Sequence, residues 1–309
     1  MRLVFAGTPA VALPSLEALS QAGHDVAAVL TRPPAPRGRS GRPVVSPVQA
    51  WAEEHGVECL TPASAKDLAL AERLGQLAPD CCPVVAYGGL VPAPLLSLPR
   101  LGWINLHFSL LPRHRGAAPV QHAILAGDAT TGATTFRLVT ALDAGPVYGS
   151  LSVPIGPTTT AGQLLDLLAQ AGAELLVEAV AAAADGVEPV AQEDGPVSLA
   201  PKITLDQVHL DWALPAERLD RLIRAANPEP GAWTVVGGKR LTVQLAQTTD
   251  EVVATGEILA RKREVLAGTG TTALRLLDVV PEGRRPMRGP DWARGWRGAG
   301  TLRAEGFAS

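Results

Sequence analysis

The chain has 309 residues, which is longer than a typical single domain, so two domains are expected. Hydrophobic residues make up 47% and charged residues 18%, a balance that excludes a disordered chain and is typical of a globular protein. The longest uninterrupted apolar runs, such as residues 81–86, are too short to span a bilayer, which argues against a membrane protein.

Charge is unevenly distributed along the chain. The net charge is −3, yet residues 1–200 hold 11 Lys and Arg against 17 Asp and Glu, whereas residues 201–309 hold 16 against 13. An acidic first part followed by a basic second part is compatible with a polyanionic partner that binds mainly the second part.

Cysteine usage and the N-terminal residues bear on the cellular compartment. The three cysteines, Cys59, Cys81 and Cys82, are odd in number and lack metal-like spacing. This argues against a disulfide framework and against a zinc site, so no metal is expected. Residues 1–9 lack the long apolar region and the cleavage site of a signal peptide. The cytoplasm is therefore the expected location.

The first half of the chain alternates short apolar runs with amphipathic or alanine-rich stretches. The apolar runs predict strands at residues 2–6, 25–30, 57–60, 81–86, 103–108, 132–139 and 146–153. The other stretches predict helices at residues 12–22, 47–55, 65–77, 117–126 and 161–184. Strands that alternate with helices pair in parallel through right-handed crossovers. The pattern predicts an α/β fold with a doubly wound, mostly parallel Rossmann-like sheet, buried on both faces.

The pattern changes after the long predicted helix. Turn-forming residues gather at 185–189 and at Gly195-Pro196, which predicts a linker over residues 186–205 between a first domain at 1–185 and a second at 206–309. One helix near 215–226 is followed by β-type runs at 232–236, 240–247, 252–259, 263–267 and 273–280. Short strands at this spacing predict a small antiparallel β-barrel, resembling an OB fold.

Two polar side chains stand at the end of the strand predicted at 103–108. Asn105 and His107 point to the same face because side chains alternate along a strand. Ligands of open α/β sheets bind at this edge. An amide beside an imidazole forms a donor pair suited to an oxyanion that develops at a carbonyl group. The same pattern also fits a polar strand end that satisfies backbone groups of the next loop.

A carboxylate follows in a later loop. Asp143 is the only acid between Asp128 and Asp166, and it follows a predicted strand. Near His107 it would orient the imidazole, raise its proton affinity or align a water for proton transfer. An aspartate close to glycine is also a common turn former, so this second interpretation stays open.

These residues carry a resemblance to a known family. The run Asn105-x-His107-x-Ser109-Leu110-Leu111-Pro112, followed by Arg115-Gly116-Ala117-Ala118-Pro119 and Leu142-Asp143, resembles the folate-dependent formyltransferases. Flanking blocks resemble the branch of that family that formylates initiator methionyl-tRNA, namely Phe5-Ala6-Gly7-Thr8-Pro9, Val84-Val85-Ala86-Tyr87-Gly88 and Asn227-Pro228-x-Pro230-Gly231-Ala232-Trp233. The resemblance covers nearly the whole chain.

The resemblance implies transfer of the formyl group of 10-formyltetrahydrofolate to the α-amino group of initiator methionyl-tRNA. It assigns Asn105, His107 and Asp143 as the catalytic residues, with no metal. The folate pocket would be built by two loops and by the residues after His107. Its members are Tyr87, Gly88, Gly89, Leu90, Val91, Ser109, Leu110, Leu111, Pro112 and Leu142. Ser109 is expected to shape its loop, and Pro112 to follow a cis peptide.

Two basic regions are expected to bind the acceptor stem of the tRNA. The segment Thr31 to Pro47 contains four arginines and five prolines, and it has no acidic residue. A solvated basic loop would have the same composition, but the family carries a tRNA-binding insertion here, which assigns Arg37, Arg39 and Arg42 to the tRNA. In the second domain the expected tRNA contacts are Lys239, Arg261, Lys262 and Arg263, among other basic side chains.

The sequence departs from the family pattern at several positions. Ala141 replaces a glycine, Phe108 a small residue, and Ala144-Gly145-Pro146 the usual residues after the aspartate. These changes bear on the pocket and not on the reaction class. Three alternatives remain: a formyltransferase acting on a small amine such as a sugar nucleotide, a formyltetrahydrofolate hydrolase, and a non-catalytic binding protein. A monomer is expected from the family alone.

Overall fold

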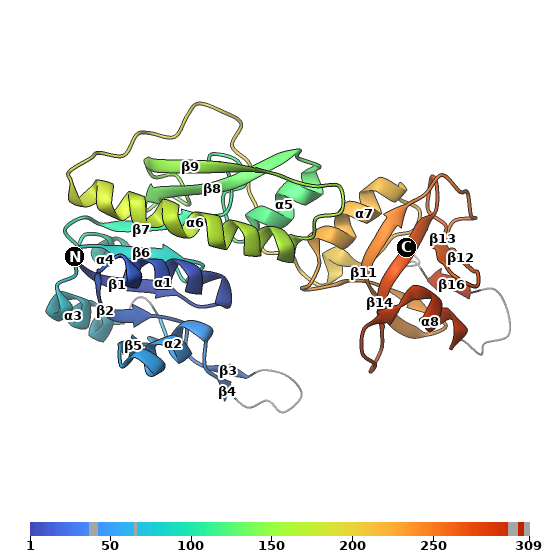
Figure 1. Cartoon of the computed structure of the whole chain (residues 1–309), viewed down its shortest axis with the longest axis horizontal. Coiled ribbons are helices and arrows are strands. Elements are labelled where there is room, and N and C mark those ends of the chain that lie inside the picture. Colours follow the sequence, from blue (N-terminus) through green and yellow to red (C-terminus); the bar gives the residue numbers. More distant parts are fainter. Residues whose placement is uncertain (37–42, 65–66, 296–301, 306–309) are drawn as a thin grey trace. The chain divides into compact units, whose positions relative to one another are not determined.

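The computed structural model describes residues 1–36, 43–64, 67–295 and 302–305, the last four by their backbone alone (Figure 1). The chain divides into two compact units. The first holds residues 1–119, 130–154 and 165–200, and the second holds residues 120–129, 155–164 and the chain from residue 201 onward. Residues 186–200, part of the expected linker, thus pack with the first unit, and the division into functional domains stays a prediction.

A seven-stranded sheet forms the centre of the first unit. Its order is β5 (Glu58–Leu60), β2 (Asp25–Leu30), β1 (Arg2–Gly7), β6 (Cys82–Val85), β7 (Trp103–His107), β8 (Thr130–Arg137) and β9 (Val147–Pro154). The strands from β5 to β7 are parallel, and β8 and β9 are antiparallel to their neighbours. The predicted doubly wound, mostly parallel sheet is therefore confirmed.

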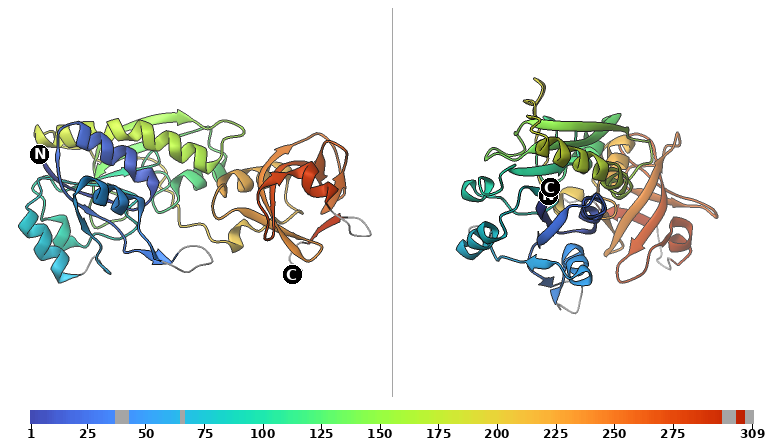
Figure 2. Two further views of the ribbon diagram at one scale, coloured as in Figure 1. Left: turned by 60° about the horizontal axis from the view of Figure 1, so that its bottom comes forward. Right: turned by 60° about the vertical axis from the view of Figure 1, so that its left-hand side comes forward.

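Helices cover both faces of this sheet. They are α1 (Leu13–Gln21), α2 (Pro47–His55), α3 (Leu68–Leu77), α4 (Ala93–Leu96) and α6 (Ala161–Ala184), with a 3-10 helix η1 (Ala10–Ala12) before α1. Helices α1 and α6 lie side by side in every view (Figures 1 and 2). Trp103 of β7 packs into the cluster that includes α3 and α4. Leu106, on the other face of β7, meets α6.

Helix α6 approaches β7 closely at one position. A Cβ atom on Gly172 would lie 2.9 Å from the side chain of Leu106, so any larger residue there would force Leu106 to shift. Among the described helices, α6 alone is long and apolar enough to cross a membrane by length and composition. Leu168, Leu176 and Val180 are fully buried in the structure, which accounts for this apolar character.

The topology decides where the loops of the first unit meet. The chain runs from β1 outward through β2 to β5, and then returns to β6 and β7 on the other side of β1. The loops after β1, β6 and β7 consequently share the carboxyl edge of the sheet, at the point where the strand order reverses. After β2, the short strands β3 (Ala35–Pro36) and β4 (Pro43–Val44) pair as a two-stranded ribbon.

The second unit contains a curled antiparallel sheet. Its strands are β10 (Ala232–Val236), β11 (Lys239–Thr248), β12 (Glu257–Ala260), β13 (Val265–Ala267), β14 (Leu274–Pro281), β15 (Met287–Arg288) and β16 (Leu302–Glu305). Its helices are α5 (Pro119–Ala126), α7 (Ala216–Ala225), α8 (Gly289–Arg294) and the 3-10 helix η2 (Asp206–Val208). Strand β14 pairs back onto β11, which closes the sheet around a core that includes Trp212, Leu219 and Val243. The predicted antiparallel barrel is confirmed.

Several elements differ from the sequence-based expectation. The strand expected at 252–259 begins only at Glu257, because a turn closed by the Glu257 N–H and the Ala254 carbonyl precedes it. The short elements β3, β4, α4, β15, α8 and β16 were not expected at all. They contain two to six residues each, too few for a periodic pattern to emerge.

Candidate active site

His107 stands at the carboxyl end of β7 and is only 6% exposed. Its Nε2 lies 2.9 Å from the backbone carbonyl oxygen of His114. A carbonyl oxygen only accepts hydrogen bonds, so Nε2 carries the ring proton and donates it. Nδ1 faces the Asp143 carboxylate, with 3.8 Å between Nδ1 and Oδ2. The Nε2–H hydrogen bond orients the imidazole, and the Asp143 carboxylate lies near its other nitrogen.

The surroundings of His107 also set its proton affinity. Burial lowers the pKa of His107 below its ordinary value, an effect reinforced by the neighbouring His114 ring. The Asp143 carboxylate and the His114 carbonyl act in the opposite direction and raise the pKa. Because the burial effect is the larger one, the pKa of His107 lies below its ordinary value, which favours the neutral imidazole at pH 7.

Asp143 lies in the loop between β8 and β9, and its side chain is 13% exposed. Its backbone adopts the left-handed region with φ +46°, which aspartate tolerates better than most residues. The carboxylate oxygen Oδ2 accepts a hydrogen bond of 2.7 Å from the Gly116 N–H. Gly116 itself has φ +128°, and a Cβ atom there would lie 2.7 Å from the Ala200 carbonyl oxygen, so glycine is required.

The segment after His107 is held by hydrogen bonds to its own backbone and to β8. The Ser109 hydroxyl donates to the Arg113 carbonyl at 2.7 Å, and Thr134 donates to the Ser109 carbonyl at 2.7 Å. The Leu111–Pro112 peptide is cis, as the resemblance implies. This fixed segment carries the His114 carbonyl and the Gly116 N–H, and so orients His107 and Asp143 together.

Asn105 lies two residues before His107 on the same face of β7 and is partly exposed. Within the described part of the chain its side-chain amide makes no hydrogen bond. The structure therefore brings the three expected catalytic residues to one edge of the sheet. The Asn105 amide can still donate hydrogen bonds, whereas the His107 imidazole is bound by the His114 carbonyl and the Asp143 carboxylate by the Gly116 N–H.

The residues expected to contact the folate differ in their exposure. Leu90 and Leu142 are 82% and 52% exposed, so the core does not use their apolar surface. The Tyr87 ring is buried among apolar side chains, and its carbonyl accepts a hydrogen bond of 2.9 Å from Thr8. Ser109 and Pro112 are buried as well, whereas Leu110 and Leu111 are partly exposed. Gly88, Gly89 and Val91 belong to the loop after β6.

The residues expected to bind tRNA are only partly described. Arg37, Arg39 and Arg42 lie outside the described residues. Lys262 and Arg263 are exposed, and neither forms an ion pair with another residue that the structure describes. Arg261 instead binds Glu251 at 2.5 Å and Glu264 at 2.8 Å, and these acids raise its pKa. The charge of Arg261 is thus largely compensated within the protein.

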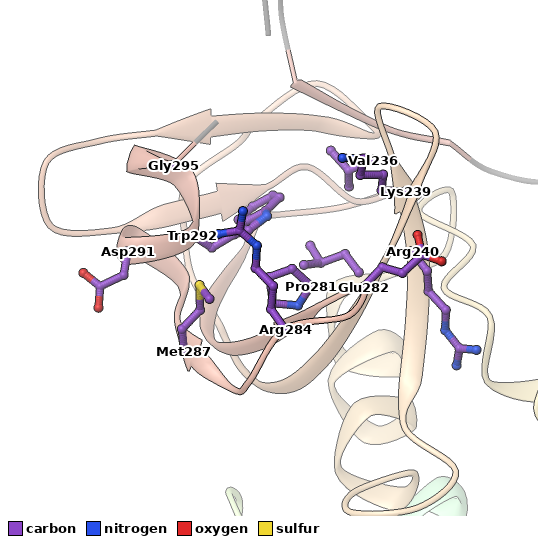
Figure 3. Close-up of a pocket in the computed structure, with 11 residues that line it drawn as sticks. Val236, Lys239, Arg240, Pro281, Glu282, Arg284, Met287, Asp291, Trp292 and Gly295 are labelled. Atoms are coloured by element: carbon purple, nitrogen blue, oxygen red, sulfur yellow. The ribbon is translucent and has the colours of Figure 1, made fainter. Parts of the chain in front are cut away.

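Lys239 lines a pocket of the second unit that combines basic and apolar side chains (Figure 3). Arg240 and Arg284 add positive charge, and Met287 and Trp292 provide apolar surface. Arg240 also lies over the Trp233 ring, with its guanidinium carbon 4.8 Å from the ring centroid. Grouped cations beside an aromatic side chain are typical of surfaces that bind nucleic acid.

Sequence reasoning missed three of the groups that organise the site. They are the His114 carbonyl, the Gly116 N–H and the side chain of Gln192. The first two are backbone groups, which leave no signal in residue type. Gln192 falls in the expected linker, far from His107 in sequence. Phe108, which departs from the family pattern, is 6% exposed and packs in the interior. No group of three or more His, Cys, Asp or Glu side chains is placed to hold a metal among the described residues.

An imidazole–carboxylate pair beside an available amide, at the carboxyl edge of an open α/β sheet, is typical of enzymes that act on a carbonyl group. Comparison with known proteins agrees with this class. Residues 1–180 match the family described as formyl transferase, and residues 202–297 match its C-terminal domain. The methionyl-tRNA formyltransferase of Mycobacteroides abscessus is 54% identical, over 96% of this chain and 97% of that protein. The chain therefore belongs to the formyl transferase family.

Solved structures show the same fold. HypX from Aquifex aeolicus, in complex with tetrahydrofolic acid, superimposes with a TM-score of 0.68 at 17% identity and covers 97% of this chain. This chain spans half of the length of HypX. The methionyl-tRNA formyltransferase from Clostridium thermocellum superimposes with a TM-score of 0.58 at 14% identity, over 81% of this chain and 94% of that one.

Proposed function

We propose that this chain transfers the formyl group of 10-formyltetrahydrofolate to the α-amino group of initiator methionyl-tRNA. The observation that carries the proposal is the arrangement around His107. The imidazole donates a hydrogen bond to the His114 carbonyl and lies beside the Asp143 carboxylate, with the Asn105 amide on the same face of β7. A relative that is 54% identical over nearly the whole chain bears the name of this activity, which supports the choice of substrates.

Asn105 stabilises the charge that develops in the reaction. When the amine attacks the formyl carbon, negative charge collects on the formyl oxygen, and the Asn105 amide donates a hydrogen bond to it. Because this amide makes no hydrogen bond to any residue that the structure describes, it can donate without reorganisation. His107 becomes a second donor only when its Nε2–H turns from the His114 carbonyl, its partner at 2.9 Å, toward the formyl oxygen.

His107 and Asp143 act on the proton that the amine loses. The Nδ1 atom of the neutral imidazole accepts this proton, directly or through one water, and the Asp143 carboxylate stabilises the imidazolium formed beside it. The new bond joins the amine nitrogen to the formyl carbon, and the bond from that carbon to N10 of the carrier breaks. His107 then returns the proton to N10, so the enzyme ends in its initial protonation state.

The loop after β6, the segment after His107 and the loop that carries Asp143 would bind the pterin end of a folate. Leu90 and Leu142 offer exposed apolar surface on which a flat ring can pack, and the backbone around Gly88, Gly89, Val91 and residues 109–112 offers hydrogen-bonding groups. The buried Tyr87 ring would support the first of these loops from the core.

Two basic regions support a tRNA acceptor in preference to a small amine. The sequence segment that contains Arg37, Arg39 and Arg42 lies outside the described residues, but its basic composition suits a phosphate backbone, as do the exposed cations Lys239, Lys262 and Arg263. A sugar nucleotide has no need of them. We further assign residues 1–185 to catalysis, residues 206–309 to tRNA binding and residues 186–205 to the connection between them. The protein is expected in the cytoplasm as a monomer.

The assignment is tested by supplying the purified chain with formyl-labelled 10-formyltetrahydrofolate. Parallel reactions contain charged initiator tRNA, an amino sugar nucleotide, or no acceptor. Label on the methionyl group of the tRNA is the expected result. Label on the sugar nucleotide would indicate a small-amine formyltransferase, and label in free formate without an acceptor would indicate a hydrolase. Absence of transfer to any acceptor would overturn the proposal.

A further inference from the structure

Gln192 is not one of the expected catalytic residues, but its side chain contacts the loop between β8 and β9 that carries Asp143, here called the Asp143 loop. Its flanking residues Ala191 and Glu193 are exposed, whereas Gln192 itself is partly buried. Its side-chain nitrogen Nε2 donates to the Asp143 carbonyl oxygen at 2.7 Å and to the Gly145 carbonyl oxygen at 3.0 Å. A primary amide has two N–H groups, so each carbonyl receives one of them.

The other end of the Gln192 amide is also engaged. Its Oε1 accepts a hydrogen bond of 2.6 Å from the guanidinium of Arg115. Arg115 directly precedes Gly116, whose N–H binds the Asp143 carboxylate at 2.7 Å. These contacts form a closed ring. Gln192 binds the Asp143 carbonyl, Arg115 binds Gln192, and Gly116, the next residue after Arg115, binds the Asp143 carboxylate.

The backbone on both sides of Gln192 is fixed. Val190 and Val147 exchange hydrogen bonds of 2.6 and 2.8 Å, which tie the segment to β9. On the other side, the Arg115 N–H binds the Ser198 carbonyl at 2.9 Å, and the Ala200 N–H binds the Arg115 carbonyl at 2.7 Å. Gln192 is thus presented to the Asp143 loop by an anchored segment.

The Asp143 loop needs such support. Asp143 has the unusual φ of +46°, and Leu142 beside it is 52% exposed, so apolar packing holds the loop only in part. Within the loop, the hydrogen bond from the Ala144 N–H to the Ala141 carbonyl is long, at 3.4 Å. The two hydrogen bonds from Gln192 are shorter than this, and they act on Asp143 itself and on the residue two positions later.

We propose that Gln192 is a positioning residue that holds the Asp143 carboxylate against His107 through its two hydrogen bonds to the Asp143 loop. This inference deepens the proposed function and rests on it. Gln192 contacts neither the His107 imidazole nor the Asp143 carboxylate. It acts by keeping the carboxylate within 3.8 Å of the imidazole, a distance that a displaced loop would lengthen. A displacement of about 1 Å at a catalytic group can lower a rate roughly 100-fold.

The sharpest variant is Gln192→Glu. A carboxylate of the same shape keeps an acceptor for Arg115 but has no N–H to offer to the two carbonyl oxygens, and it adds a negative charge beside them. Comparison with the uncharged Gln192→Ala separates the loss of the hydrogen bonds from the effect of that charge. Gln192→Ala removes all three contacts. Glu193→Ala changes the exposed neighbour and is the matched control. We expect both Gln192 variants to lower kcat by about 10- to 100-fold. The KM for tRNA should stay within twofold of wild type.

Three further measurements separate positioning from a general loss of structure. The stoichiometry of tetrahydrofolate binding should match that of Glu193→Ala, and each variant should unfold in a single cooperative transition. Hydrogen exchange at the Gly116 amide should accelerate in both Gln192 variants, because its acceptor, the Asp143 carboxylate, is no longer held. A Gln192→Glu enzyme with kcat within twofold of the control, or one whose loss of kcat follows a loss of folate-binding sites, would overturn the inference.

Failure of the proposed function gives a different result. If the wild type formylates no acceptor, the proposed reaction has failed, but Gly116 amide exchange still reports whether Gln192 holds the carboxylate. Unchanged exchange in both Gln192 variants would overturn the positioning role whatever the reaction is.

Discussion

The end of β7 and the basic surface of the second unit (Lys239, Arg261, Lys262 and Arg263) differ in whether their charged and polar groups are buried or exposed. His107 and Asp143 are 6% and 13% exposed, and each is oriented by a backbone group, at 2.9 Å and 2.7 Å respectively. In the second unit, Arg261 is 42% exposed and shared between two acids, while Lys262 and Arg263 stand in solvent. The first region fixes a few buried groups in place, whereas the second presents several exposed ones.

This difference has an energetic basis. A buried polar group interacts strongly with its neighbours and costs free energy when it loses its partner, so its position determines its effect. Exposed charges are screened by water and salt, and each of them contributes little on its own. Single substitutions should therefore have large effects on rate at the end of β7 and small effects on affinity in the second unit.

The largest expected effect is that of His107→Ala. Removal of the imidazole deletes the proposed proton acceptor, and such groups contribute about 10²- to 10⁴-fold to a rate. Single-turnover transfer to charged tRNA should fall by roughly 10³-fold, while the dissociation constant of the tRNA stays within twofold of wild type. A variant that retains more than a tenth of the rate would remove His107 from the mechanism.

Asn105→Ala should follow with a loss in kcat of about 10²- to 10³-fold, because the variant lacks the proposed donor to the formyl oxygen. The KM for the formyl donor should change little, since the charge to be stabilised appears only in the transition state. Steady-state kinetics in both substrates measures this. An increase in KM at unchanged kcat would instead assign Asn105 to ground-state binding.

The pH dependence tests the electrostatics of the pair. His107 accepts a proton only when neutral, so kcat/KM should fall about tenfold per pH unit below its pKa. Burial lowers the pKa of His107 from 6.5, while the Asp143 carboxylate raises it and the His114 ring lowers it. In Asp143→Asn the raising effect is lost, so the pKa drops further and the acid limb should move to lower pH. A limb that moves upward would contradict this assignment.

The smallest expected effect belongs to the basic surface. Lys262→Ala should weaken tRNA binding by a few fold at most, in line with the small contribution of one exposed charge. The slope of log affinity against log salt concentration should decrease by about 1, as expected for one lost phosphate contact. Binding titrations at several salt concentrations measure both quantities. An unchanged slope would show that Lys262 does not face phosphate.

The two regions also differ in how far the sequence predicts them. Buried runs such as Leu3 to Ala6 predicted the central strand, because a strand covered on both faces is apolar throughout. The alternation of side chains placed Asn105 and His107 on one face. The position of Asp143 beside His107 came from the family resemblance alone, since periodicity says nothing about which loops meet.

Other features had no signal in the sequence. The orientation of His107 depends on the His114 carbonyl, and a backbone carbonyl is the same for every residue type. Gln192 lies 49 positions after Asp143 in a segment of turn-forming composition, where a single glutamine is unremarkable. Arg261 looks like its basic neighbours in the sequence, but Glu251 and Glu264 compensate its charge in the fold.

The close approach of α6 to β7 at Gly172 gives the protein a sensitive point on the side of the strand away from the site. A methyl group there would lie 2.9 Å from the side chain of Leu106, the buried neighbour of His107, so Leu106 would have to move. A screen for slow variants should therefore recover substitutions at Gly172, although it is buried and lies on the opposite face of β7 from His107.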